Sequence, residues 1–194
     1  MLQNIDFYKT VNDLRDLPRE SRAEIVFAGR SNAGKSSAIN AIVGRKKLAF
    51  VSKSPGRTQH INFFSFGDQR YLVDLPGYGY ARVPGEIKEH WQGLLGAYLQ
   101  KRQQIRGLVL VMDARHPLQP LDEQMLLWFK LRGRPLHVLL SKSDKLSSSE
   151  NKKTLAHVEK ILGELGKQFT VQLFSSSKKW GIEEAKSVIH GWLA

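Results

Sequence analysis

A glycine-rich loop near the N-terminus constrains the fold of this chain more than any other feature. An apolar run at residues 25–28 leads into the loop, and residues 37–43 after it have the composition of a helix. A strand, a glycine loop and a helix in this order form a phosphate-binding P-loop, whose pattern is G-x-x-x-x-G-K-[ST]. The loop matches that pattern at every fixed position, over Gly29, Arg30, Ser31, Asn32, Ala33, Gly34, Lys35 and Ser36.

The residue types of the loop indicate its chemistry. Glycines let backbone N–H groups surround a polyphosphate without Cβ clashes, and the following helix adds the positive end of its dipole. Lys35 is expected to reach the β- and γ-phosphates, and the Ser36 hydroxyl to bind Mg²⁺. The alternative is a chance match in an ordinary glycine turn, which the flanking strand and helix argue against.

The composition indicates one soluble domain. With 194 residues, 41% of them hydrophobic and 25% charged, the chain can bury a substantial core. It has no cysteine, and no apolar run approaches the ~20 residues that cross a bilayer. Residues 1–7 lack the basic start and apolar core of a secretory signal. We therefore expect a cytoplasmic monomer that is not bound to a membrane.

The charge is the unusual part of the composition. Thirty Lys and Arg residues against eighteen Asp and Glu give a net charge of +12 and a pI of about 10.0. Such a field favours polyanions, either nucleic acid or an anionic membrane surface, although solubility alone is the simpler explanation. No basic amphipathic helix with a Trp, Phe or Leu face supports membrane binding. We therefore favour an RNA-rich partner.

Apolar runs alternate with helical segments along most of the chain. The alternation predicts a three-layer, doubly wound α/β fold with a mostly parallel six-stranded sheet and one antiparallel edge strand. Residues 1–23 are predicted to form an extended or briefly helical arm packed on a single domain at 24–194. The expected strands are 24–28, 61–66, 71–73, 107–112, 136–140 and 171–174; the expected helices are 37–44, 86–102, 120–133, 148–165 and 182–193.

Two further segments are expected to face the phosphates, because ligands of open α/β sheets bind outside the carboxyl ends of the strands. The turn Asp74, Leu75, Pro76 and Gly77 ends the strand at 71–73. Asp74 is expected to hold Mg²⁺ through water, and the Gly77 N–H to meet the γ-phosphate. Thr58 follows a loop with five basic residues and no acid at 45–57, and it is a natural second Mg²⁺ ligand if the γ-phosphate orders that loop.

The base is expected to lie at the ends of two later strands. Ser141, Lys142, Ser143 and Asp144 follow the strand at 136–140. A carboxylate there can accept both the N1–H and the 2-amino hydrogens of guanine, a pair that adenine does not offer, and the Lys142 stem can lie along the base. Phe174, Ser175 and Ser176 end the last strand, where backbone N–H groups could bind the guanine O6. This set predicts GTP rather than ATP.

Together the motifs look like the five G motifs of a translation-factor-class P-loop GTPase, and their wording resembles the EngB (YihA/YsxC) family of bacterial GTPases. The wording is carried by residues 29–37, 56–59, 73–81, 113–117 (Asp-Ala-Arg-His-Pro) and 174–176. The resemblance implies a role in assembly of the large ribosomal subunit, with its RNA and proteins as partner, and a need for the protein in normal cell division and septation. It also implies GTP and Mg²⁺ binding, with Ser36 and Thr58 as metal ligands. The implied nucleotide ligands are the residues named above together with Gly56, Arg57, Thr58, Gln59 and His60.

The sequence departs from related GTPases at several positions. Ser141 stands where Asn or Thr is usual, and Ser176 where Ala is common, and neither change is expected to abolish guanine binding. Tyr78 follows Gly77 where many signalling GTPases place a water-orienting Gln, so no catalytic base is assigned. Asn32 matches an asparagine that helps bind K⁺ in related GTPases, or it simply stabilises the loop. We expect slow hydrolysis that K⁺ or a ribosomal partner accelerates.

Several readings stay open at this point. Tyr78 and Tyr80 could dock on a partner in one nucleotide state or pack in the core, and His116 and His137 lack metal-ligand spacing and are expected to be structural. The alternatives to a GTP-dependent switch are a P-loop enzyme of another class, such as a nucleotide or small-molecule kinase, and a division scaffold in which GTP is only structural.

Overall fold

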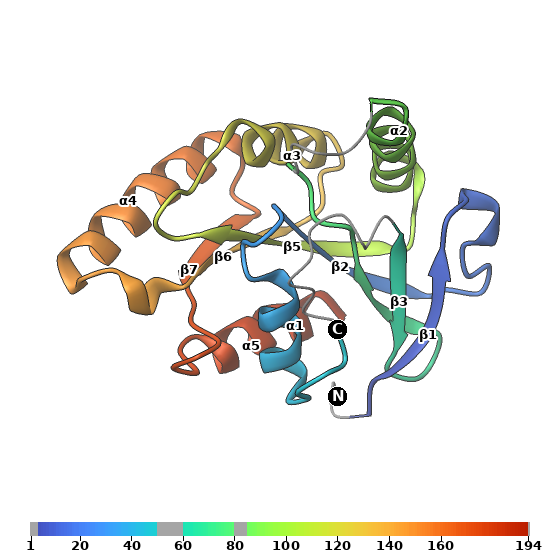
Figure 1. The fold of residues 1–194 in the computed structure, drawn as a ribbon, viewed down its shortest axis with the longest axis horizontal. Helices are drawn as coiled ribbons and strands as arrows, with labels where there is room; N and C mark the ends of the chain where they lie inside the picture. The colour runs from blue at the N-terminus through green and yellow to red at the C-terminus, as the bar shows by residue number, and fades with distance from the viewer. Residues whose placement is uncertain (1–3, 50–59, 80–84, 194) are drawn as a thin grey trace.

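A single mixed sheet runs through the centre of the molecule (Figure 1). The computed structural model describes residues 4–49, 60–79 and 85–193. Within them, seven strands pair in the order β1-β3-β4-β2-β5-β6-β7. Their bounds are β1 (Asp6–Val11), β2 (Ala23–Gly29), β3 (Ile61–Ser65), β4 (Arg70–Asp74), β5 (Ile105–Asp113), β6 (Leu136–Ser141) and β7 (Phe169–Leu173).

Helices cover both faces of the sheet, as the alternation of elements predicts. They are α1 (Lys35–Val43), α2 (Gly85–Lys101), α3 (Pro120–Lys130), α4 (Ser148–Leu165) and α5 (Ile182–Leu193). In Figure 1, α2, α3 and α4 lie on one side of the sheet and α1 and α5 on the other. Each side has its own hydrophobic core, with Phe129 of α3 in one and Ile39 of α1 in the other. The three-layer doubly wound architecture is confirmed.

The central strands feed both cores at once. In β2, Val26 and Ala28 pack into the α2–α3–α4 core, whereas Ile25 and Phe27 pack into the α1–α5 core. A strand that is buried on both faces reads as a continuous apolar run. That is why the run before the P-loop was recognisable in the sequence.

The sheet has one strand more than the six predicted. Part of the N-terminal arm, β1, pairs antiparallel with β3, so β3 is the second strand of the sheet rather than its edge. The sequence of β1 has no apolar alternation, since most of its residues are exposed. What makes it a strand is the free edge of β3, whose unpaired N–H and C=O groups need a partner, and that requirement is not written in the residues of β1.

The remaining elements differ from the predictions mainly at their ends. Helix α1 begins at Lys35 rather than at residue 37, so the lysine and serine of the P-loop form its first turn. Helix α4 starts with the expected capping box, in which the Glu150 N–H donates to Ser147 Oγ (3.3 Å) and the Ser147 N–H donates to Glu150 Oε2 (2.7 Å).

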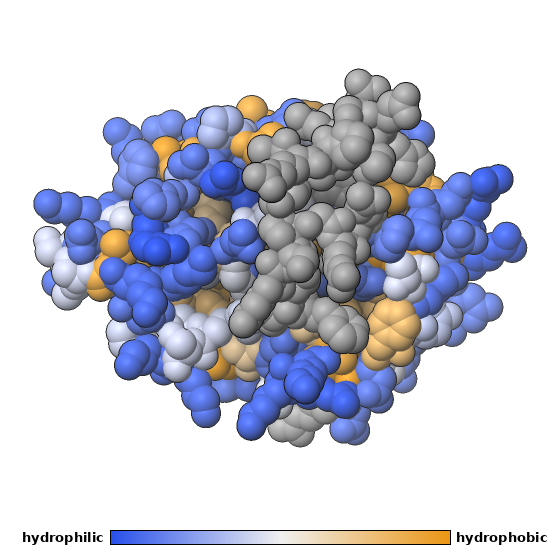
Figure 2. All heavy atoms as spheres, in the orientation of Figure 1, coloured by the Kyte–Doolittle hydropathy of each residue, from blue (hydrophilic) through white to orange (hydrophobic). Residues whose placement is uncertain are grey.

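The coloured part of the face drawn in Figure 2 is mainly polar. Figure 2 shows hydrophilic residues over most of the visible face, with small apolar areas between them. Across the described ranges, none of the helices has the length and apolarity that a bilayer span requires.

Candidate nucleotide-binding site

The P-loop leaves β2 and enters α1 through two positions that only glycine suits. A Cβ on Gly29 would stand 2.7 Å from the carbonyl oxygen of Val111 on the neighbouring strand. Gly34 caps the N-terminus of α1 with a φ of 95°, which L side chains rarely adopt. Asn32 also has a positive φ, 64°, a region in which asparagine is enriched. The loop backbone is therefore specified by its own residues.

The lysine of the P-loop is bonded to the aspartate that ends β4. The Lys35 ammonium donates to the Asp74 carboxylate, and the two residues are only 8% and 5% exposed. The structure thus brings together two motifs that lie 39 residues apart. Ser36, the expected Mg²⁺ ligand, is the second residue of the same helix and is partly exposed.

The segment after Asp74 runs directly beside the start of the P-loop. The Tyr78 N–H donates to the Gly29 carbonyl (3.3 Å), and the Ser31 N–H donates to the Tyr78 carbonyl (2.8 Å). A Cβ on Gly77 would come within 3.2 Å of the Ser31 backbone. A glycine at 77 therefore allows this close approach between the two segments.

Tyr78 packs in the core, which settles one of the open alternatives for the described part of that loop. Its side chain is buried, and its hydroxyl donates to Asp122 Oδ1 on α3 (2.7 Å). Burial, with the Asp122 carboxylate beside it, raises the pKa of Tyr78 well above its usual value. Burial also raises the pKa of Asp122. Tyr80 lies outside the described residues.

The base half of the candidate site is joined to the P-loop by two side chains at the end of β6. Ser141 donates its hydroxyl to the Ala33 carbonyl, and Lys142 Nζ donates to the Asn32 carbonyl (2.7 Å). Lys142 adopts a left-handed backbone conformation, with φ 58°, that turns the chain at the end of the strand. The expected guanine motif is therefore hydrogen-bonded directly to the backbone of the P-loop.

Asp144 is oriented by the last of the sequence motifs. The Ser175 hydroxyl donates to Asp144 Oδ1 (2.6 Å), while the Ser143 hydroxyl donates to the Phe174 carbonyl (2.9 Å). The hydrogen bond from Ser175 lowers the pKa of Asp144. The carboxylate is thus kept ionised, as an acceptor for two guanine N–H groups must be.

Known proteins share both the sequence and the fold of this chain. A family model described as "50S ribosome-binding GTPase" matches residues 24–142. The probable GTP-binding protein EngB of Laribacter hongkongensis is 58% identical over 196 residues, which cover 100% of this chain and 87% of that protein. This chain belongs to the EngB family. A probable EngB protein of Neisseria meningitidis serogroup B is 56% identical over 195 residues, covering 100% of this chain and 93% of that protein.

Solved structures agree on the fold. A crystal structure of a probable GTP-binding protein EngB aligns with a TM-score of 0.71 at 24% identity, covering 88% of this chain and 98% of that one. Era from Aquifex aeolicus, bound to GDP and AlF4⁻, aligns with a TM-score of 0.68 at 19% identity, covering 87% and 56%. The EngB-family chain is therefore a P-loop GTPase, an enzyme that hydrolyses GTP.

One residue of the candidate site enters the sequence analysis only through the family resemblance, with no ligand role assigned to it. Asp113 ends β5 and accepts from Lys142 Nζ (3.0 Å) and from Arg115 Nε (2.9 Å) and Nη2 (2.7 Å). Burial would raise the pKa of Asp113, but the hydrogen bonds from Arg115 and Lys142 outweigh it and hold the pKa well below the ordinary range. The available signal was its position, because it closes a buried strand at the same sheet edge as Asp74.

Part of the expected site lies outside the described residues. This applies to Gly56, Arg57, Thr58 and Gln59, whereas His60 directly precedes β3 and is partly exposed. Leu75 and Phe174 contribute their side chains to the hydrophobic cores, so only their backbone groups can face a nucleotide.

The described start of the basic loop contacts the N-terminal arm. Arg45 forms an ion pair with Asp6 (2.6 Å), and the side-chain amide of Asn40 exchanges hydrogen bonds with the Ala49 backbone (2.8 and 2.9 Å). The first basic residue of this loop is therefore already partnered within the chain.

His137 is structural, as expected. Its ring nitrogens lie 2.8 Å from Thr170 Oγ1 and 2.8 Å from Gln172 Oε1, both on β7. Burial lowers the pKa of His137, so the ring is held neutral between β6 and β7.

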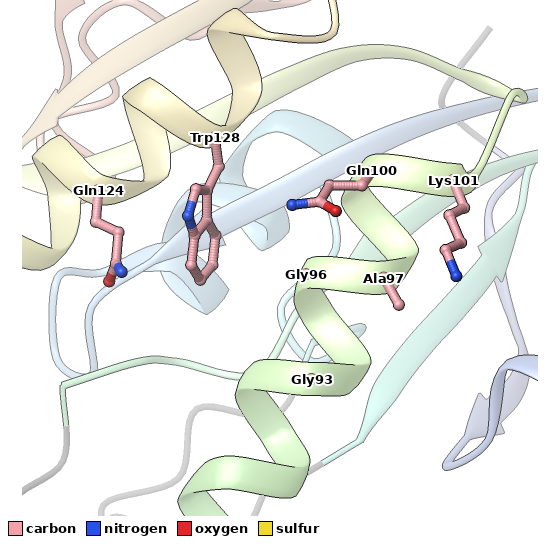
Figure 3. Close-up of a pocket in the computed structure, with 7 residues that line it drawn as sticks. All are labelled: Gly93, Gly96, Ala97, Gln100, Lys101, Gln124 and Trp128. Atoms are coloured by element: carbon pink, nitrogen blue, oxygen red, sulfur yellow. The ribbon is translucent and has the colours of Figure 1, made fainter.

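A separate hollow lies between α2 and α3 (Figure 3). Small residues of α2 (Gly93, Gly96 and Ala97) form one wall, and Gln124 and Trp128 of α3 form the other. Among the described residues that line it, Lys101 is the only titratable one. None of these described lining residues belongs to the GTP motifs.

Proposed function

We propose that this EngB-family protein is a GTP-dependent switch that acts in the cytoplasm on a precursor of the large ribosomal subunit. Cells would need it for normal division and septation, directly or through ribosome assembly. The observation that supports the proposal is that the guanine motif and the P-loop are bonded to each other at one edge of the sheet. Lys142 and Ser141 of the guanine motif bond the backbone of the P-loop, so base recognition and phosphate binding share one frame.

The guanine motif supports GTP as the nucleotide. Ser175 orients the ionised Asp144 carboxylate, and a site built to bond two substrate N–H groups rejects an analogue without them strongly, by about 10⁴-fold in well-built sites. Competition with labelled GDP tests this step. ATP that displaced GDP as well as GTP did would contradict it.

The residues around Lys35 fit a Mg²⁺ ion. Mg²⁺ takes oxygen ligands and keeps several waters. Ser36, which carries a hydroxyl, follows Lys35 in α1, and the Asp74 carboxylate is bonded to Lys35. Across the described ranges there is no cluster of three His, Cys, Asp or Glu side chains for a metal, consistent with an ion held by hydroxyls and nucleotide oxygens. Bound there, Mg²⁺ would neutralise charge on the β- and γ-phosphates.

Nucleotide binding requires the Lys35–Asp74 pair to separate. Lys35 would turn from the carboxylate to the phosphates, and Asp74 would become a ligand of a metal-bound water. The chain after Asp74 is bonded to the P-loop through the Tyr78 backbone. This exchange of partners would therefore change the position of the chain that follows Asp74. This is the switching element of the proposal.

Among residues 4–49, 60–79 and 85–193, we identify no side chain for fast intrinsic hydrolysis. The Tyr78 hydroxyl is engaged with Asp122 and does not replace a water-orienting glutamine. The backbone carbonyl of Asn32 accepts from Lys142, whereas Asn32 itself is exposed, so its side-chain oxygen can bind K⁺. We propose that K⁺ or a ribosomal partner accelerates turnover; a turnover of about 10 s⁻¹ in Na⁺ alone would contradict this.

Sedimentation with purified large-subunit precursors tests the switch. The expected result is binding with a non-hydrolysable GTP analogue and weak binding with GDP, because only GTP carries the γ-phosphate that the Gly77 N–H is expected to meet. Equal binding in both states would overturn the switch and leave the scaffold alternative, in which GTP is structural.

A further inference from the structure

Residues 175–181 belong to the loop between β7 and α5 (Figure 1), and they include a tryptophan, Trp180. Trp180 is 50% exposed, although most large apolar side chains of the described residues are buried. Two exposed lysines, Lys178 and Lys179, come directly before it. The loop is thus a cationic segment with an aromatic side chain open to solvent.

The loop is held in one shape by bonds at its base. The Trp180 N–H donates to the Ser175 carbonyl (3.0 Å), and the Ser175 N–H donates to the Trp180 carbonyl (3.2 Å). Gln172 Nε2 donates to the Gly181 carbonyl (2.7 Å), and Gly181 has a φ of 72°. A Cβ on Gly181 would stand 2.3 Å from Gln172 Nε2. The backbone that carries the indole is therefore fixed before any ligand arrives, which lowers the entropic cost of binding.

The exposed cations of the loop itself are Lys178 and Lys179. Two lysines outside the loop are paired with acids: Lys145 with Asp144 (3.6 Å), to which the loop is bonded through Ser175, and Lys186 with Glu183 at the start of α5 (2.7 Å). An aromatic face beside two exposed lysines suits a chain that alternates flat bases with phosphates.

We propose that the loop 175–181 is a stacking platform for unpaired RNA. A base would lie on the Trp180 indole, and the neighbouring phosphates would contact Lys178 and Lys179. Duplex RNA, whose bases are already stacked on one another, does not fit this arrangement. The inference rests on the proposed function in taking ribosomal RNA as the partner, and it assigns a surface to that partner.

Fluorescence anisotropy with a labelled single-stranded oligouridylate tests the platform on the full-length, GDP-bound protein. Trp180→Ala is expected to weaken binding roughly 5- to 100-fold, the range for loss of one stacking aromatic, whereas Trp180→Phe retains most of the affinity. Leu131→Ala is the matched control, since Leu131 is 83% exposed on the end of α3, and it is expected to leave the affinity unchanged. An unchanged affinity for Trp180→Ala would overturn the proposal.

The lysines give a second, independent measurement. The double variant Lys178→Ala with Lys179→Ala is expected to reduce the slope of log affinity against log salt by about 1.4, since each phosphate contact on a single strand contributes about 0.7. A slope equal to that of the unchanged protein would contradict the phosphate contacts. A duplex of the same length that lost as much affinity on Trp180→Ala would contradict the stacking.

Failure of the platform and failure of the switch can be told apart. If the protein sediments with precursors only in the GTP state but Trp180→Ala binds oligouridylate normally, the switch stands and the platform is wrong. If Trp180→Ala loses RNA binding while precursors bind equally in GDP and GTP, the platform stands and the switch is wrong. If Trp180→Ala loses the precursor but not the oligouridylate, the partner of Trp180 is a protein, which also overturns the proposal.

Discussion

The two halves of the GTP site differ in how their charged groups are used. In the base half, Asp144 takes a hydrogen bond from a serine and Lys142 takes its place against the P-loop backbone. In the phosphate half, Lys35 and Asp74 are bonded to each other. The base half is thus preorganised for the proposed guanine, whereas the phosphate half would have to exchange partners to bind phosphates. In the proposed function, the first half selects the base and the second half switches.

The largest expected effect tests the internal pair of the phosphate half. Lys35→Met leaves the buried Asp74 carboxylate without its cation, and removal of one partner of a buried pair typically costs about 3–5 kcal/mol. Urea denaturation without nucleotide should show this loss. The double variant Lys35→Met with Asp74→Leu should recover most of it, and a single variant as stable as the unchanged protein would mean that the pair is not formed in solution.

The next effect tests selection in the base half. Asp144→Asn replaces an acceptor of two N–H groups by an amide, and the affinity for GTP should fall about 100-fold, or ~2.7 kcal/mol. Xanthosine triphosphate, which carries a carbonyl where guanine has its amino group, should then bind better than GTP. Equilibrium competition with labelled GDP measures both. An Asn variant that kept its preference for guanine would remove Asp144 from base recognition.

A smaller effect is expected from the residue that anchors Lys142. Asp113→Asn weakens the bond to Lys142 Nζ, and the affinities for GDP and GTP should fall together by about 5- to 10-fold, the equivalent of a modest hydrogen-bond loss of ~1 kcal/mol. Stopped-flow release of a fluorescent nucleotide is the measurement. Arg115→Ala is the matched control, because it removes the other, more exposed partner of Asp113. A loss for GTP alone would place Asp113 in the phosphate half instead.

The smallest effect concerns the pH dependence of the strands that carry the base half. Burial lowers the pKa of His137, so below about pH 6.5, the ordinary value, the unfolded chain binds a proton that the folded chain resists. Stability should therefore be constant above that pH and fall as the pH decreases through it. Urea denaturation between pH 7.5 and 5.5 should show a shallower decline for His137→Gln. Parallel declines would assign the pH dependence to other groups.

The order of strands and helices, and most of the GTP motifs, could be read from residues that are close together in the chain. Gly29 and Gly34 indicate positions where the backbone approaches a neighbour closely or has a positive φ. The apolar run before them indicates a strand that is buried on both faces. Ser147 and Glu150 announce the start of α4 because a cap is a local interaction. The family resemblance has the same local origin, and the comparisons with known proteins confirm it.

The tertiary structure decided what depends on partners that are far apart in the chain. The strand β1 exists because β3 offers it an edge, the burial of Tyr78 depends on Asp122 of α3, and the place of Asp113 depends on Lys142. These pairs are separated by tens of residues, and each side chain alone is compatible with solvent or with several partners. The sequence by itself determined that the chain binds a guanine nucleotide through a P-loop. The tertiary packing determined which charged groups are free to bind a ligand, such as Asp144, and which are bonded to each other, such as Lys35 and Asp74. The reason is that these contacts depend on which strand ends lie side by side.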